Sequence, residues 1–524
     1  MENLQYICRQ LSGEPFAKMA LPFKRSVGYR PDRLRMLGAL GISGCLILGA
    51  GLAGCGGAAS PDASASNLIG ANAANTSGAE KKRFDYPNVI DASFGNNGTV
   101  SMSTGYTEKV TVNGFQTHDF TVDRLGRIVV VGTRSSADRE AWIYRMLSDG
   151  TPDPSCGTGG WSSFTTPGGP ATPRKIVQMP DGRYVMGGVL GLPGIVAIGE
   201  NCSVDRSFGT DGAAPFPSVP VLEVGGPVNA LAVDSSGRIL ATVEDTLSGR
   251  LVVARFLSNG QLDASFGTAG LASVKPTDGT NEVIGRDIAV RSDGRILIAT
   301  QMVYSSQVGF WAGFAQLMPN GALDVSFGEA GFVSVKPAPN LIANPKSMVL
   351  LPDGSAIQGG LTQPGVLVGT ALLVDAYWLK VDASGRPDPR FGKSGLLIWN
   401  AGPQGTDGQN NVEAMAPVGV NGEYFASCQY WMNRSEPTVQ GIPELASQQS
   451  IVQWRSSATG ELLTQYANGG TGWLPRDNDP QSELFNRCIG LKVGKEGKLL
   501  ALLELAAVKN ALEPMFAVAR ISPR

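Results

Sequence analysis

The sequence predicts an all-β protein, a seven-bladed β-propeller, and three observations carry that prediction. An eight-residue motif recurs along the chain, and its clearest copy is Asp263-Ala264-Ser265-Phe266-Gly267-Thr268-Ala269-Gly270. Recurrence at a regular period is the mark of a repeat architecture. Between motifs, four short runs of apolar and β-branched residues alternate with glycine-bearing turns. Four antiparallel strands per repeat form the unit of a propeller.

Six copies of the motif begin with aspartate, and a seventh is degenerate. They begin at Asp91, Asp153, Asp205, Asp263, Asp324 and Asp388, and the seventh runs from Leu463 to Gly470. The aromatic position is occupied in order by Phe94, Cys156, Phe208, Phe266, Phe327, Phe391 and Tyr466, with separations of 62, 52, 58, 61, 64 and 75 residues. Aspartate and serine suit a turn, and glycine permits positive φ. We therefore expect a structural role for the motif.

The stretch between two motifs reads as strands joined by turns. In the third unit, the runs are residues 228–233, 238–243, 251–256 and 271–274, and residues 234–237 form the first turn. Such β-rich runs between glycine turns predict a four-stranded antiparallel sheet. The glycine of the first turn recurs in the other units as Gly126, Gly182, Gly294, Gly354, Gly422 and Gly497.

The order of motifs and turns predicts how the ring closes. The first motif, at Asp91, precedes the first turn at Gly126, and no motif follows residues 516–520 near the end of the chain. The last blade therefore lacks its fourth strand, while the N-terminal side has a spare one. We expect residues 100–102 to complete the last blade, because closure removes exposed sheet edges.

These repeats resemble the delta-60 repeat β-propeller family, whose hallmark is a Leu-Asp-x-Ser-Phe-Gly-x-x-Gly segment in every repeat. The resemblance covers residues 91–524, although Cys156 and the segment 463–467 depart from the pattern. It implies the propeller architecture and says little about chemistry.

Residues 1–54 predict a signal peptide. Basic residues between Lys24 and Arg35 precede an apolar run over 37–52, which is short for a spanning helix, and the run ends in Leu52-Ala53-Gly54-Cys55. This end resembles the lipobox of bacterial lipoproteins, in which the cysteine is lipidated, so Cys55 is the expected lipidation site. A simple membrane anchor is the alternative. Gly56 resembles outer-membrane sorting, so we expect an exported protein in the outer membrane, periplasmic or surface-facing.

Residues 55–83 read as a flexible tether rich in glycine, alanine and serine, and residues 84–524 as the propeller, which we expect to be monomeric. Four of the seven cysteines fall in the propeller: Cys156, Cys202, Cys428 and Cys488. An even number outside the cytosol suggests two disulfide bonds, and places in neighbouring blades favour pairing 156 with 202 and 428 with 488. Four buried free thiols are the alternative.

Composition excludes some functions. The net charge is −2 and there is no run of basic residues, so nothing indicates nucleic-acid binding. His118 is the one histidine, and no zinc cluster, calcium loop or phosphate loop is present, so neither a metal nor a cofactor is expected. No catalytic residue can be assigned, and a non-enzymatic role is favoured.

One set of positions suggests a binding site. Eight residues before each first-turn glycine, five of seven units carry a polar residue: His118, Arg174, Asn229, Arg286 and Lys346. Ala414 and Ile489 take the other two places. Innermost strands surround the axis of a propeller, so this set predicts an electropositive ring that binds an anion. The alternative is a set of solvated strand ends, and Asp119 and Asp287 could neutralise the ring.

Aromatic residues form a second feature. They are expected in or next to loops, where they could bind a sugar or peptide or pack between blades: Trp161, Tyr304, Trp311, Trp399, Tyr430, Trp431 and Trp473. The longest insertion, residues 429–450, is the expected lid or partner loop. We therefore predict a lipid-anchored binding or scaffolding module whose partner is an envelope protein or an anionic glycan. The alternatives are a hydrolase or lyase acting on an anionic polysaccharide, with His118 in its site, and a docking subunit of an envelope assembly.

Overall fold

The computed structural model describes residues 89–522 except 97, 104–114, 135–139, 167–168, 170, 191, 218–225, 246–247, 305–308, 338–340, 365–373, 400–407, 434–437, 440–441, 444–447, 468, 475–484 and 507–513. The chain divides into two units, Met1–Glu80 and Lys81–Arg524, and every described residue belongs to the second. The predicted signal peptide, the tether with Cys55, and residues 84–88 lie outside the described residues.

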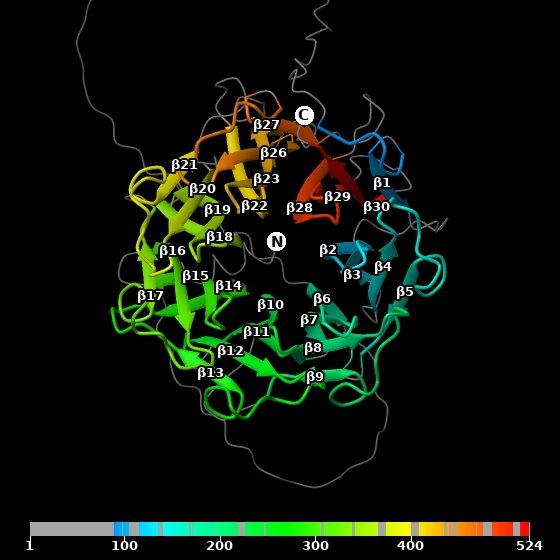
Figure 1. Cartoon of the computed structure of the whole chain (residues 1–524), viewed down its shortest axis with the longest axis horizontal. Coiled ribbons are helices and arrows are strands. Elements are labelled where there is room, and N and C mark those ends of the chain that lie inside the picture. Colours follow the sequence, from blue (N-terminus) through cyan, green and yellow to red (C-terminus); the bar gives the residue numbers. More distant parts are fainter. Residues whose placement is uncertain are drawn as a thin grey trace, which may run out of the picture. The chain divides into compact units, whose positions relative to one another are not determined.

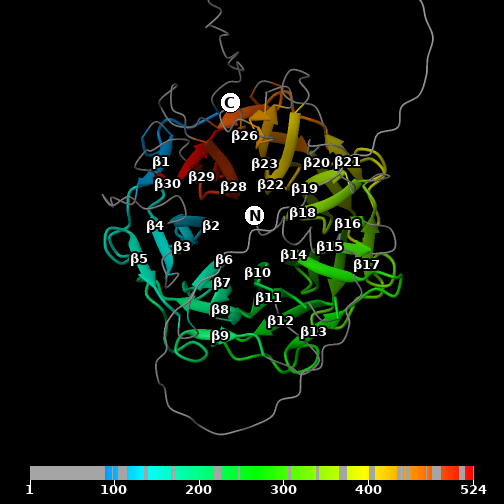
Figure 2. The same ribbon diagram turned by 180° about the vertical axis from the view of Figure 1, so that it is seen from behind.

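Seven four-stranded antiparallel sheets stand around one axis, so the predicted seven-bladed β-propeller is confirmed. Within each blade the strands follow one another outwards from the axis (Figure 1), and Figure 2 shows the same ring from behind. Among the described residues all regular elements are strands. No helix in this part of the chain has the length and apolar character needed to cross a membrane.

The blades take their strands in chain order, with one exception. Blade 1 is β2(Phe115–Val122), β3(Ile128–Arg134), β4(Glu140–Met146) and β5(Trp161–Phe164); blade 2 is β6(Ala171–Gln178), β7(Tyr184–Leu190), β8(Leu192–Ile198) and β9(Ala213–Pro215). Blade 3 is β10(Ala230–Val233), β11(Ile239–Glu244), β12(Leu251–Phe256) and β13(Leu271–Val274); blade 4 is β14(Glu282–Val290), β15(Ile296–Tyr304), β16(Gly309–Leu317) and β17(Phe332–Val335). Blade 5 is β18(Leu341–Leu350), β19(Ala356–Pro364), β20(Asp375–Val381) and β21(Leu396–Trp399).

The last two blades differ from this plan in one respect each. Blade 6 is β22(Gly408–Val418), β23(Tyr424–Asn433), β26(Gln448–Ser456) and β27(Thr471–Leu474), with the small hairpin of β24(Thr438–Val439) and β25(Ile442–Pro443) between its second and third strands. Blade 7 is β28(Phe485–Val493), β29(Leu499–Ala506), β30(Pro514–Ile521) and the N-terminal β1(Thr99–Ser103). The insertion predicted over 429–450 is therefore partly strand.

The ring closes through pairing between the two ends of the domain. Strand β1 pairs antiparallel with β30, with Val100 opposite Val518, so the predicted closure is confirmed. The carboxylate of Asp91 also lies 2.9 Å from Arg520 and 2.7 Å from Lys498. The first motif therefore anchors the N-terminal strand to the last blade by backbone and side-chain bonds together.

The recurring motif forms a turn that is tied to its own blade. In blade 3, the Asp263 carboxylate accepts hydrogen bonds from the backbone N–H and the hydroxyl of Ser265, at 3.1 and 2.6 Å. Its second oxygen accepts from Arg255 at 2.8 Å and lies 3.7 Å from Arg238, the basic residue that follows the first-turn glycine. Phe266 is fully buried. The motif aspartate thus joins two strands and a turn.

The motif also bonds each blade to the next. The Gly267 N–H donates to the carbonyl of Asn320 in the following blade at 2.7 Å. The neighbouring Gly321 lies against the ring of Phe266 so closely that an added Cβ would come within 2.9 Å of it. Gly321 has a φ of 87°, in the left-handed region that favours glycine. Aromatic burial and an inter-blade hydrogen bond therefore occur at one contact.

Two disulfide bonds join neighbouring blades. Cys156 is bonded to Cys202 with a Cα–Cα distance of 5.0 Å, and Cys428 to Cys488 with a distance of 6.1 Å. All four cysteines are buried. The rest of the core also lies between blades, because the apolar clusters combine residues of adjacent sheets, as where Val185 of blade 2 joins Val252 of blade 3.

Candidate functional site

The predicted ring of polar residues coincides with a backbone irregularity of the innermost strands. Six of the seven innermost strands carry a β-bulge, in which one residue has no partner across the ladder. The bulge residues are His118, Arg174, Arg286, Lys346, Glu413 and Ile489. In blade 3, β10 begins after this position, and the Asn229 N–H donates to the Thr242 carbonyl at 3.0 Å. The innermost strands surround the axis (Figure 1), so the six bulges lie around it.

The sixth member of this ring is Glu413 and not Ala414, the position that counting back from the turn glycine gives. The stretch between bulge and turn has five residues in β22, Ala414–Val418, but four in β14, Asp287–Val290. The extra residue moves an acidic side chain into the ring. Sequence counting therefore missed a carboxylate and overestimated the positive charge.

His118 is a poor candidate for proton transfer near neutral pH. Its Nε2 lies 2.9 Å from the Thr133 hydroxyl. Burial is the largest effect and Arg174 adds to it, so the pKa of His118 falls to about 4 although Asp119 opposes the shift. The imidazole is therefore neutral at physiological pH, and it contributes hydrogen bonding to the ring rather than charge.

Asn229 and Arg286 are engaged by other side chains. The Asn229 amide donates to Glu244 at 3.1 Å. Arg286 lies 3.7 Å from the same carboxylate oxygen and donates to Gln301 at 2.5 Å. These contacts fix both side chains, and Glu244 partly balances the charge of Arg286. Sequence analysis did not predict Glu244, because it lies on β11 and not on an innermost strand.

Three cations of the site have no such partner. Arg174 is exposed, and Lys175 and Lys346 are partly exposed. Among the described residues, none makes a hydrogen bond or an ion pair with these three side chains. Lys175, which directly follows the bulge residue of blade 2, was not among the predicted site residues. Lys175 occupies in blade 2 the position equivalent to that of Asp119 in blade 1.

These cations influence one another across the ring. Burial lowers the pKa of Lys346 most, and Arg487, Arg286 and Lys175 lower it further, while Glu413 opposes the shift. These residues come from blades 2, 4, 5, 6 and 7, so the side chains converge on one region. The positive charges therefore repel one another there, and Glu413 offsets part of that repulsion.

The two aspartates that could neutralise the ring have structural partners. Asp119 accepts a hydrogen bond from the backbone N–H of Ile176 in the next blade at 3.0 Å, and Asp287 accepts one from Met348 at 2.8 Å. They still act on Lys175: burial lowers its pKa, but both carboxylates outweigh that effect and the pKa is raised. Asp119 and Asp287 therefore offset part of the positive charge.

An acidic and basic cluster borders the cations. Arg487 lies 2.9 Å from Glu413 and 3.8 Å from Glu504. Burial raises the pKa of Glu504, with Arg487 opposing and Glu413 reinforcing the shift. The site thus has a cationic part, formed by blades 2 and 5, and a mixed part, formed by blades 6 and 7. The described residues contain no group of three or more His, Cys, Asp or Glu suited to a metal ion.

The predicted aromatic residues lie on strands near their ends. Trp161 stacks on Trp142 with ring centroids 4.9 Å apart, and Tyr304 lies 4.3 Å from Trp311. The ring of Trp399 faces Arg455 at 5.7 Å. Packing between strands and blades accounts for these contacts. The backbones of Tyr430 and Trp431 belong to β23 and that of Trp473 to β27, while their side chains lie outside the described structure.

Comparison with known families gives one match. Residues 235–266 and 291–327 match the model described as "Domain of unknown function (DUF5122) beta-propeller". Each matched segment runs from a first turn to the motif phenylalanine, Phe266 or Phe327, and so covers the middle of blades 3 and 4. This match supports a β-propeller family. A comparison with curated proteins found no match.

Solved structures provide further similarities in fold. The chain is similar to the polysaccharide lyase Uly1 at 11% identity, covering 80% of this chain and 94% of the lyase, with a TM-score of 0.44. It is similar to the WD40 β-propeller domain of Doa1 at 12% identity, covering 79% and 96%, with a TM-score of 0.38. An endo-arabinase from Bacteroides thetaiotaomicron VPI-5482 has 9% identity, covering 59% and 99%, with a TM-score of 0.30. The activities that these names state belong to those proteins.

Proposed function

We propose that the chain is a lipid-anchored β-propeller of the cell envelope that acts as a binding module for an anionic glycan at its axis. One observation carries the proposal: Arg174 and Lys346 occupy the bulges of two innermost strands, Lys175 beside the first bulge acts electrostatically on Lys346, and no described residue forms a hydrogen bond or ion pair with any of the three side chains. A guanidinium can bind a carboxylate or sulfate through two parallel bonds, and lysine adds a compact charge. Burial is the largest cause of the lowered pKa of Lys346, and an anion would relieve the repulsion from neighbouring cations that adds to it.

Binding to anionic polymers tests the axial site. The probes are polygalacturonate and chondroitin sulfate, with poly-glutamate to detect a preference for acidic peptide. We expect the paired changes Arg174→Gln and Lys346→Gln to weaken glycan binding roughly tenfold or more, since each lost charged contact is worth about 1.5–3 kcal/mol. Salt should weaken wild-type binding by screening.

A matched variant controls for net charge. Arg386→Gln with Lys393→Gln removes the same charges from exposed positions in blade 5, and it should bind as the wild type does. Melting curves confirm that each variant is folded. The proposal is wrong if the wild type binds neither glycan, or if the axial and control variants bind equally well. Preference for poly-glutamate would replace the glycan by an acidic protein partner.

The anchor is tested separately, because its support is the sequence of residues 37–55 alone. Lipidated Cys55 would become the mature N-terminus, and two or three acyl chains would hold the protein at a bilayer. We expect Cys55→Ser to prevent lipidation and to release the protein from the membrane fraction. A variant that is processed and sediments with membranes as before would rule out the lipid anchor without affecting the axial site.

A further inference from the structure

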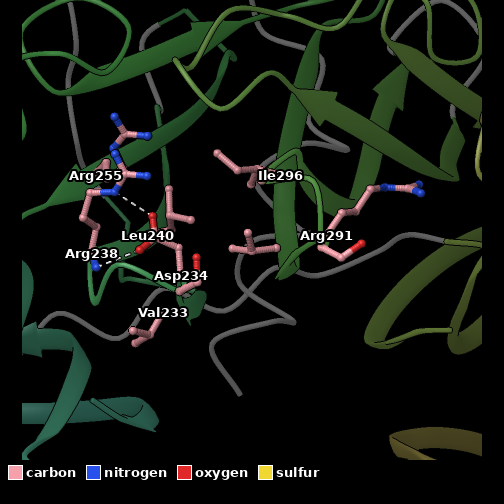
Figure 3. Close-up of a pocket in the computed structure, with 11 residues that line it drawn as sticks. Val233, Asp234, Arg238, Leu240, Arg255, Arg291 and Ile296 are labelled. Carbon is pink, nitrogen blue, oxygen red and sulfur yellow. Dashed lines mark hydrogen bonds and ion pairs between the residues drawn. The ribbon is translucent and has the colours of Figure 1, made fainter. Parts of the chain in front are cut away.

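A polar-rimmed pocket lies between blades 3 and 4, at the first turns of both blades (Figure 3). Its volume is ≈ 260 Å³. Asp234, Arg238 and Arg255 of blade 3 lie on one side, and Arg291 and Ile296 of blade 4 on the other. The guanidinium of Arg291 points away from Asp234 in this view. The apolar walls are Val233, Leu240, Val290 and Ile296. A smaller cavity, of about 150 Å³, is enough to hold benzene.

The same protein fills the corresponding space between blades 1 and 2 with a phenol. Tyr184 of blade 2 is fully buried, and its hydroxyl donates to an oxygen of Asp123 in blade 1 at 2.8 Å. Two arginines of blade 1, Arg127 and Arg145, donate to this phenol oxygen at 3.2 and 3.4 Å. The tyrosine hydroxyl thus forms hydrogen bonds with one carboxylate and two guanidinium groups at this blade boundary.

Blade 3 has the same carboxylate and two guanidinium groups, but among the described residues no tyrosine hydroxyl lies between them. Asp234 accepts from the backbone N–H of the residues two and four positions later and from the Arg238 side chain at 2.7 Å. Asp123 makes the same three bonds in blade 1. Arg255 pairs with the motif aspartate of blade 3 as Arg145 does in blade 1. The difference is Ile296, which opens β15 where Tyr184 opens β7.

The arrangement occurs at these two blade boundaries alone. At the position of Asp123 and Asp234, the other five blades carry Met179, Arg291, Leu351, Gly419 and Gly494, and none of these side chains is a carboxylate. Among the seven blades, only blades 1 and 3 therefore carry a carboxylate at this position, and Tyr184 already occupies the one in blade 1.

We infer that this pocket binds a ligand through a p-hydroxyphenyl group. The ligand hydroxyl donates to Asp234 and accepts from Arg238 and Arg255, and its ring contacts Leu240, Val290 and Ile296. An ionised carboxylate is an acceptor only, so Asp234 selects a hydroxyl donor over an anion. Because Arg238 and Arg255 already pair with carboxylates, the site favours a neutral phenol.

Two sources can supply a phenol, a small molecule or the tyrosine of a peptide. Titration with p-cresol, followed by ligand-observed NMR, tests the shared chemistry, and N-acetyl-tyrosinamide then tests whether the pocket admits a peptide backbone. We expect p-cresol to bind at least about tenfold more tightly than 4-methylanisole, which lacks the donor, since leaving a buried acceptor unpaired costs about 1–3 kcal/mol.

Variants of Ile296 connect the binding to this pocket. Ile296→Tyr should place the protein's own phenol against Asp234, as Tyr184 lies against Asp123, and abolish p-cresol binding. Ile296→Val keeps the space and should retain binding. Should Ile296→Tyr fail to fold, Asp234→Asn serves instead: it keeps an acceptor for the turn and should lose the preference for p-cresol over 4-methylanisole.

Three results would overturn the inference: absence of p-cresol binding to the wild type, equal binding of 4-methylanisole, or binding that survives Ile296→Tyr. The axial variants Arg174→Gln and Lys346→Gln should not change p-cresol binding, because their residues do not line this pocket. A failure here therefore leaves the axial glycan site unaffected.

Discussion

Cys156 is bonded to Cys202 at the place where five other blade boundaries pack a phenylalanine ring against a turn glycine. Cys156 occupies the motif position of Phe266. Cys202 occupies the turn position of Gly321 and has a positive φ of 63°. The backbone contact beside them is unchanged, since the Gly157 N–H donates to the carbonyl of Asn201 at 3.2 Å. A covalent bond thus replaces an apolar contact within the same inter-blade geometry.

This replacement predicts a specific rescue. Changing both cysteines to alanine should lower the free energy of unfolding by about 2–4 kcal/mol, because the cross-link is lost and no ring fills the space. Cys156→Phe with Cys202→Gly should recover a substantial part of the lost free energy. It places at positions 156 and 202 the same kind of contact that Phe266 makes with Gly321. Urea denaturation measures the free energy of unfolding of both variants.

Non-reducing peptide mapping tests whether the disulfides form. It should find two disulfides in exported protein, and four free thiols would contradict the bonding itself.

The degenerate motif of blade 6 replaces an ion pair with an apolar pair. Leu463 donates its N–H to the carbonyl of Trp454 at 2.9 Å, as Asp263 does to Arg255. The side chains of Leu463 and Trp454 belong to one apolar cluster. Leu463→Asp alone should destabilise the protein by about 1–3 kcal/mol, because a partly buried carboxylate lacks its cation.

A double-mutant cycle tests whether the two positions act as a pair. Adding Trp454→Arg to Leu463→Asp should cost less than the sum of the single changes, because the arginine supplies the missing partner. The control pair is Arg255→Ala with Leu463→Asp, whose residues belong to different blades and whose effects should add. Strict additivity in the first cycle would show that the motif positions are independent.

Ring closure depends on β1. Removing residues 91–102 deletes the strand that pairs with β30 and the carboxylate that binds Arg520 and Lys498. The edge of β30 would then be open to pairing with another molecule. We expect aggregation or a large loss of thermal stability, measured by light scattering during melting. A soluble deletion variant with an unchanged melting temperature would contradict the closure argument.

The motif carboxylates make the protein sensitive to acid. Burial would raise the pKa of Asp153, Asp263 and Asp324, but hydrogen bonds from the serine two residues later and from a basic or amide side chain outweigh it and lower the pKa. For the motif residues Asp91, Asp205 and Asp388, a side-chain hydrogen bond is the largest effect on the pKa, and it lowers the pKa in each case.

The sign of the pH effect follows from these shifts. A carboxylate whose folded pKa lies below its unfolded value, about 3.9 for aspartate, stabilises the fold above that value, and the stability is lost as the pH falls towards the folded pKa. The urea midpoint should therefore change little for these groups between about pH 5 and 8 and fall steeply below about pH 4. Asp263→Asn should lower the midpoint at neutral pH and reduce the slope in acid. A slope equal to that of the wild type would exclude Asp263 from the acid response.

The repeat sequence was enough to predict the blades, because turn glycines, motif aspartates and apolar strands act over short distances within one unit. Phe266 is buried and Gly267 has positive φ for reasons that the local sequence contains. The count of motifs and turns likewise predicted that the strand containing Val100 would pair with β30, since closure of the ring is a matter of order along the chain.

The tertiary structure decided what the binding residues face. A β-bulge shifts the strand register by one residue, so the sequence could not distinguish Glu413 from Ala414 or show that Lys175 belongs with Arg174 and Lys346. The pocket at Ile296 depends on Asp234 in the preceding blade, 62 positions earlier in the sequence. Contacts between blades join residues that are distant in the chain, and only the assembled ring determines which charges and which empty spaces meet.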